Sequence, residues 1–86
     1  MGIVISGDAV IGRNCTIFHE VTIGINEIKS AEAPIIGDNV FIGAGAKIIG
    51  KVQVGSNSRI GANAVITKDV PEGATVVGVN KIINNK

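Results

Sequence analysis

The sequence has 86 residues, of which 45% are apolar, and its only aromatic residues are Phe18 and Phe41. Eight Lys and Arg against seven Asp and Glu give a net charge of +1, and no basic run of the kind that binds nucleic acid is present. No apolar run reaches membrane-spanning length, the first residues do not resemble a signal peptide, and a single cysteine excludes an intrachain disulfide. We therefore expect one cytoplasmic domain with neither a membrane nor a nucleic acid partner.

Isoleucine recurs at every sixth position in the first part of the chain, at Ile5, Ile11, Ile17 and Ile23. An α-helix turns every 3.6 residues and cannot keep a period of six on one face, whereas short strands joined by sharp corners can. The abundance of Ile, Val and Gly also favours strands and tight turns. Each six-residue unit is therefore predicted to form one side of a triangular coil, with its Ile inside.

The six-residue count breaks between Ile23 and Ile36, which are thirteen residues apart rather than six or twelve. The centre of this segment is polar and charged. We interpret residues 25–35 as a loop that leaves the stack at one corner, and loops on a rigid scaffold often carry function. The alternative is a degenerate pair of repeats that remains coiled.

The count then restarts and continues to the end of the repeats. A small or branched residue comes four positions after nine of the ten slots, with Cys15 and Ser58 among these residues, and glycine directly follows six of the ten slots. Repeats of this kind stack so that like residues form continuous inner ladders. Residues 71–86 contain a turn, a last apolar stretch and a polar tail, which we expect to cap the stack or to pack against a neighbouring chain. The slots of this second block are Ile36, Ile42, Ile48, Val54, Ile60 and Ile66.

Three phrases, "GRNCTIFHEVTIG", "IIGDNVFIGAGAKIIGKVQVG" and "SRIGANAVITKDVPEGATVVGV", resemble the hexapeptide-repeat acyltransferases. The resemblance is closest to the serine acetyltransferase branch and to related sugar O-acetyltransferases, and the chain looks like the C-terminal part of such an enzyme. It implies an all-β fold, a left-handed parallel β-helix of about three to four coils. It also implies a homotrimer that binds acetyl-CoA, and no metal, in the groove between subunits.

The implied reaction is acetyl transfer from acetyl-CoA to a hydroxyl, with serine as the leading acceptor and a sugar hydroxyl of a capsule or lipopolysaccharide precursor as the alternative. A histidine would remove the hydroxyl proton, since neutral imidazole is a base near neutral pH. The only histidine, His19, is expected to point outward near a corner, either as a surface residue or as a substitute base. The family's catalytic histidine would fall two positions before Met1, and its second histidine is replaced by Ala33. The second hypothesis is therefore a truncated, catalytically inactive trimeric scaffold or CoA-binding protein.

The resemblance also suggests cofactor-binding residues. Backbone groups at Ala44 and Ala62 would contact the pantetheine arm of CoA, and Gly24 would lie near the thioester. Lys68 and Lys81 could face the CoA phosphates through charge-assisted contacts. The alternative is that Gly and Ala simply suit coil corners and that both lysines are solvated.

Overall fold

The computed structural model describes residues 2–25 and 32–85, and in this part of the chain all regular structure is β-strand. Twelve strands are short and joined by turns, as the six-residue period requires. They are β1 (Val4–Ile5), β2 (Val10–Ile11), β3 (Thr16–Ile17), β4 (Thr22–Gly24), β5 (Ile35–Ile36), β6 (Phe41–Ile42), β7 (Lys47–Ile49), β8 (Gln53–Val54), β9 (Arg59–Ile60), β10 (Val65–Ile66), β11 (Ala74–Val77) and β12 (Lys81–Asn85).

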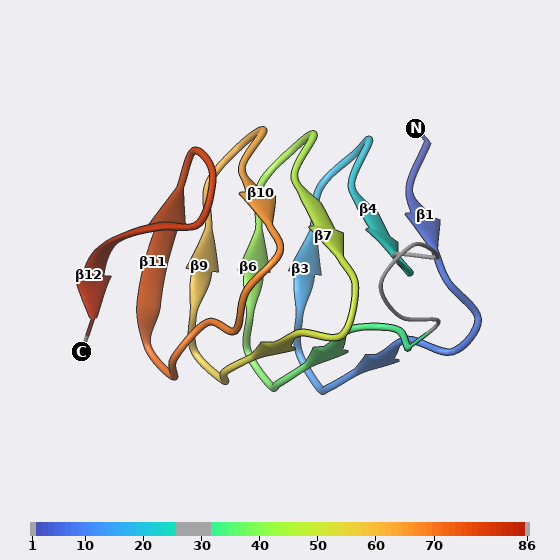
Figure 1. The fold of residues 1–86 in the computed structure, drawn as a ribbon, viewed down its shortest axis with the longest axis horizontal. Coiled ribbons are helices and arrows are strands. Elements are labelled where there is room, and N and C mark those ends of the chain that lie inside the picture. The colour runs from blue at the N-terminus through green and yellow to red at the C-terminus, as the bar shows by residue number, and fades with distance from the viewer. Residues whose placement is uncertain (1, 26–31, 86) are drawn as a thin grey trace.

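Three sheets form the sides of a triangular prism. Side 1 contains β1, β4, β7 and β10, side 2 contains β2, β5 and β8, and side 3 contains β3, β6, β9 and β11 with β12 at its edge. In Figure 1 the chain advances from right to left, while the strands of side 1 run down the near face and those of side 3 run up the far face. This sense of turning is left-handed. The predicted left-handed parallel β-helix is therefore confirmed.

The strand register accounts for the break in the repeat. Val4 lies opposite Thr22 and Lys47 lies opposite Val65, so these partners are 18 residues apart. Across the break, Thr22 lies opposite Lys47, which is 25 residues away. Seven additional residues therefore enter between β4 and β5 without changing the alignment of the strands. Most of the predicted loop, residues 26–31, lies outside the described residues.

The core consists of three ladders of inward-facing slot residues. Ile23, Ile48 and Ile66 on side 1 are fully buried, whereas Ile5 at the N-terminal end of the same ladder is 41% exposed. Ile5 has a coil on only one side, since β1 pairs with β4 alone. The predicted inner position of Ser58 is also found: its buried hydroxyl donates a hydrogen bond to the carbonyl oxygen of Gly55 at 2.7 Å.

Gly43 follows a slot, and the contact between coils explains why this position is glycine. Gly43 does not have a positive φ. A Cβ atom there would lie 2.7 Å from the backbone nitrogen of Ala62 on the next coil. Close approach of successive coils, rather than a left-handed backbone, therefore requires glycine at this position.

The corner between sides 2 and 3, called the 2/3 corner, is built on left-handed residues. Asn14, Asn39 and Asn57 have φ values of 59°, 58° and 64°, and Gly73 takes the same place in the last coil with a φ of 74°. Asparagine and glycine are the residues that adopt this conformation most readily.

The C-terminal end of the stack differs from the coils. Strand β12 pairs antiparallel with β11, with Lys81 opposite Val77. In Figure 1 this hairpin lies at the left end of the prism. In the described part of the chain, no helix has the length and apolar character needed to cross a membrane.

Candidate functional site

Three of the predicted site residues, His19, Ala44 and Ala62, stack at the corner between sides 3 and 1, which we call the 3/1 corner. The N–H of Gly45 donates to the carbonyl oxygen of His19 at 3.0 Å, and the N–H of Asn63 donates to that of Ala44 at 2.8 Å. Each residue thus occupies the same place in the turn of its own coil. Figure 1 shows these turns side by side along the upper edge of the prism. We call His19, Ala44 and Ala62 the turn column.

The turn column contains two backbone donors that have no partner among the described residues. Within the described residues, the N–H groups of Ala44 and Ala62 donate no hydrogen bond to the protein. Two unpaired N–H groups on successive coils, about 4.8 Å apart, suit an extended ligand that carries amide carbonyls, as the pantetheine arm of CoA does.

His19 is exposed in the turn between β3 and β4. Its imidazole makes no hydrogen bond to another described residue, so no carboxylate orients it within one chain. The next residue, Glu20, has a φ of 59°, an uncommon value for a residue other than glycine or asparagine. The column therefore begins with an accessible imidazole on a tightly turned backbone.

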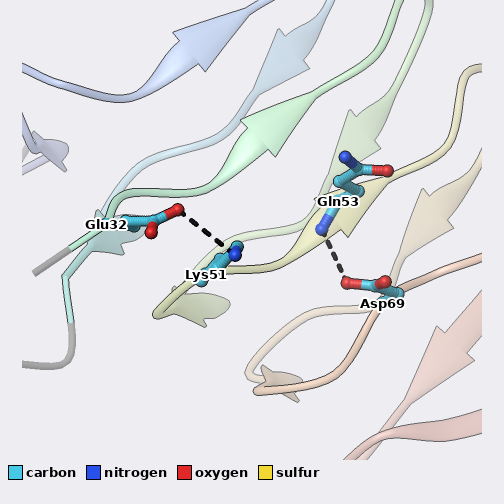
Figure 2. Close-up of polar contacts among 4 residues, drawn as sticks. All are labelled: Glu32, Lys51, Gln53 and Asp69. Carbon is cyan, nitrogen blue, oxygen red and sulfur yellow. Dashed lines mark hydrogen bonds and ion pairs between the residues drawn. The ribbon is translucent and has the colours of Figure 1, made fainter. Parts of the chain in front are cut away.

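Gly24 and Lys68 lie at the other edge of side 1, at the corner between sides 1 and 2, which we call the 1/2 corner. The carbonyl oxygen of Gly24 accepts a hydrogen bond from the N–H of Gly50 at 2.9 Å. Lys68 is exposed, and the bend that carries it is fixed by Asp69, whose Oδ1 accepts a hydrogen bond from the backbone nitrogen of Gln53 at 2.9 Å (Figure 2). Ala44 and Ala62 therefore lie at one edge of side 1, and Gly24 and Lys68 lie at the other.

The remaining predicted residue, Lys81, lies on the terminal hairpin. It is the first residue of β12 and its side chain is exposed. The turn before it is held by Asn80, whose side-chain Oδ1 accepts from the N–H of Thr67 at 2.8 Å while its Nδ2 donates to the Thr67 hydroxyl at 2.7 Å. The hairpin is thus fastened to the end of side 1.

The sequence interpretation missed a group of residues at the 2/3 corner. A shallow hollow of about 490 Å³ lies there, and we call it the asparagine groove; its polar and aromatic lining is Asn14, Thr16, Asn39, Phe41, Asn57 and Arg59. The three asparagines each come three positions after a slot, so the register of the repeat could have predicted that they stack.

Comparisons with known proteins agree with this architecture. Residues 33–68 match the family model described as bacterial transferase hexapeptide (six repeats). The serine acetyltransferase of Mycobacterium tuberculosis (strain ATCC 25618 / H37Rv) is 49% identical over 79 residues, which cover 91% of this chain and 34% of that protein.

Two solved structures are similar as well. The serine acetyltransferase of Brucella abortus strain S19 in complex with coenzyme A has a TM-score of 0.90 and 44% identity, covering 96% of this chain and 34% of that one. The serine acetyltransferase of Neisseria gonorrhoeae in complex with serine has a TM-score of 0.83 and 48% identity, covering 90% and 32%.

The fold and the repeats agree with the match of residues 33–68 to the bacterial transferase hexapeptide model, so the chain is similar to proteins of this class. Within that class the chain is related to the serine acetyltransferases, so the resemblance noted in the sequence is confirmed. The chain spans between 33% and 46% of the length of the first three curated relatives that it matches.

Proposed function

We propose that this chain forms the acyl-transfer scaffold of a cytoplasmic O-acetyltransferase, which moves the acetyl group of acetyl-CoA to the hydroxyl of L-serine. The observation that carries the proposal is the turn column, where Ala44 and Ala62 present unpaired N–H groups on successive coils. Related serine acetyltransferases have been solved with coenzyme A and with serine.

Acetyl-CoA would supply the acetyl group as a thioester. The N–H groups of Ala44 and Ala62 would hold the pantetheine arm along the column, and the cationic side chains of Lys68 and Lys81 would bind phosphates. The serine hydroxyl oxygen attacks the thioester carbonyl carbon, the new C–O ester bond forms, and the C–S bond breaks to release the thiol of CoA. His19, the only imidazole of this chain, would accept the hydroxyl proton and then deliver it to the departing sulfur of CoA.

The separation of the predicted residues into two groups supports a composite site in a homotrimer. Strand β4 runs from the turn that contains His19 to Gly24, so the two residues lie at opposite edges of side 1. A threefold arrangement with side 1 toward the axis would place the 3/1 corner of one copy beside the 1/2 corner of the next. His19 would then face the neighbour's Gly24 and Lys68 across a subunit groove.

The experiment is an assay of thiol release from acetyl-CoA with and without L-serine, on protein whose mass is measured by sedimentation. We expect a particle of three 8.8 kDa chains and serine-dependent release. His19→Gln should lower the rate about 100-fold or more, since general bases contribute that much. Arg13→Gln, an exposed substitution away from the column, should leave the rate unchanged. A monomer, or full activity in His19→Gln, would contradict the proposal.

A second candidate function, CoA binding without turnover, is favoured by one observation. No described group orients the imidazole of His19, whereas a catalytic base is normally held by a third residue. In that case CoA would bind and protect the N–H groups of Ala44 and Ala62 from hydrogen exchange, while no thiol would be released. Release that depends on a sugar instead of serine would identify the alternative acceptor.

A further inference from the structure

The asparagine groove is not explained by the proposed transferase site. It lies at the start of side 3, whereas the turn column lies at the far end of the same side, where the strands finish. The groove is bordered by β3, β6 and β9, so three successive coils contribute to it. Whatever it binds must therefore lie along the axis of the prism.

The groove contains a row of side-chain amides that the backbone does not require. Asn14, Asn39 and Asn57 satisfy the positive φ of the corner, but Gly73 satisfies it equally well in the last coil. Among residues 2–25 and 32–85, the side-chain amides of these asparagines make no hydrogen bond to the protein. Each amide can donate and accept, so the row offers paired hydrogen bonds at every coil.

The remaining lining adds one positive charge and one aromatic face. Arg59 is exposed, and no acidic side chain of the described residues forms an ion pair with it. No carboxylate lines the groove. Phe41 is 40% exposed and packs against Phe18, with ring centroids 5.2 Å apart and a tilt of 52°. The second ring supports the first, so Phe41 presents a fixed apolar surface beside the amides.

From this arrangement we propose that the asparagine groove binds a chain of sugar rings that carries a carboxylate. Hydroxyl groups of successive rings pair with the amides of Asn14, Asn39 and Asn57, the carboxylate pairs with Arg59, and one ring face lies on Phe41. The groove depends on none of the groups assigned to acetyl transfer.

The spacing of the amides distinguishes a saccharide from a peptide. Successive coils are about 4.8 Å apart, whereas like-facing residues of an extended peptide repeat at about 6.7 Å. An extended peptide therefore loses register with the amides within three coils. Pyranose rings in a β-1,4-linked chain advance by close to one coil spacing per ring. Successive rings are turned over, but each ring carries polar groups at both edges, so each ring can still meet one asparagine.

The test is an NMR titration of the isotope-labelled protein with a β-1,4-linked tetramer of mannuronic acid and with cellotetraose, its neutral counterpart. We expect saturable shifts of the backbone amides of residues 14–16, 39–41 and 57–59, with the acidic tetramer binding about tenfold more tightly. An acidic tetrapeptide of the same charge serves as the third probe.

Substitutions then test each contact. Asn39→Gly and Asn57→Gly keep a residue suited to positive φ, so they remove the amide without straining the corner. Each should weaken the acidic tetramer about fivefold, the effect of one to two hydrogen bonds. Arg59→Gln should abolish the preference for the acidic tetramer. The matched controls, Asn63→Gly at the 3/1 corner and Arg13→Gln outside the groove, should leave binding unchanged.

Three outcomes would overturn the inference. The first is the absence of saturable shifts in the groove with either tetramer at about 10 mM, a concentration that detects very weak binding. The second is stronger binding of the acidic tetrapeptide than of the saccharide. The third is equal weakening by Arg13→Gln and Arg59→Gln, which would indicate attraction to surface charge in general. None of these outcomes depends on thiol release, so a failed transferase assay leaves this test intact.

Discussion

Successive coils approach closely at Gly43, and replacing this residue by alanine tests whether that approach requires glycine. A Cβ atom there would lie 2.7 Å from the nitrogen and 3.0 Å from the Cα atom of Ala62, both backbone atoms that no side-chain rotation can move away. Relief requires the coils to separate, which stretches the 2.8 Å hydrogen bond from the N–H of Gly43 to the carbonyl oxygen of Ile60. Overpacking of this kind costs about 1–3 kcal/mol, so we expect Gly43→Ala to lower the free energy of unfolding by about 2 kcal/mol.

Gly24 provides the matched control. A Cβ atom at Gly24 would have Ile49 Cδ1 and Thr22 Cγ2 as its nearest neighbours at 4.0 Å, an ordinary van der Waals distance. Gly24→Ala should therefore be neutral or stabilise the fold by up to about 1 kcal/mol, because alanine restricts the unfolded chain.

Urea titration followed by far-UV circular dichroism measures both variants, at one protein concentration because association would contribute to stability. With a slope of about 1 kcal/mol per molar urea, Gly43→Ala should shift the midpoint down by about 2 M. Equal losses in Gly43→Ala and Gly24→Ala, or no loss in Gly43→Ala, would refute the close-approach explanation.

Two further predictions use the same titration. Ile42 is fully buried between two coils, so Ile42→Ala should lower the free energy of unfolding by about 3–4 kcal/mol. Ile5 is 41% exposed, so Ile5→Ala should lower it by less than about 1 kcal/mol. Similar losses in the two variants would show that the first coil is covered in solution. Lys51 lies 3.6 Å from Glu32 (Figure 2), but both side chains are well exposed, at 70% and 63%. Lys51→Ala should therefore change stability by less than about 0.5 kcal/mol at any salt concentration, and a loss above about 1 kcal/mol would show that the pair is significant.

The inner half of the fold could be predicted from the sequence because burial acts on every coil in the same way. A position such as Ile48 lies between two identical environments, so its residue type repeats at the period of the coil. The same logic placed Ser58 inside, and its hydroxyl is satisfied by a carbonyl of its own turn. The six-residue pattern is sufficient to predict which side chains are buried wherever one coil repeats the one before it.

Contacts between coils were harder to predict, because they depend on which atoms of one turn face the next. The period shows that glycine follows the slots, but not that Gly43 faces the backbone of Ala62. The period also does not show that Oδ1 of Asp38 accepts a hydrogen bond from the N–H of Arg13, which precedes it by 25 residues and lies on the adjacent coil.

The arrangement of the proposed site residues could be predicted only in part. His19, Ala44 and Ala62 share one place in the repeat, and the structure stacks them. Gly24 has a different place and lies at the opposite edge of side 1. In the proposed homotrimer, the association of chains would bring the two edges together, and a repeat within one chain carries no signal for that association.

The seven residues that enter between β4 and β5 have a consequence for how this protein can change. The added length leaves every inward residue in its ladder, since Ile23 still lies beneath Ile48. A core that depends on strand register is usually intolerant of insertions. Here the added residues lie between β4 and β5, and the strand register is regular again from β5 onward. The 1/2 corner can therefore be lengthened or shortened without redesigning the interior. New recognition elements could be grafted there, by evolution or in the laboratory, onto a scaffold whose stability is set elsewhere.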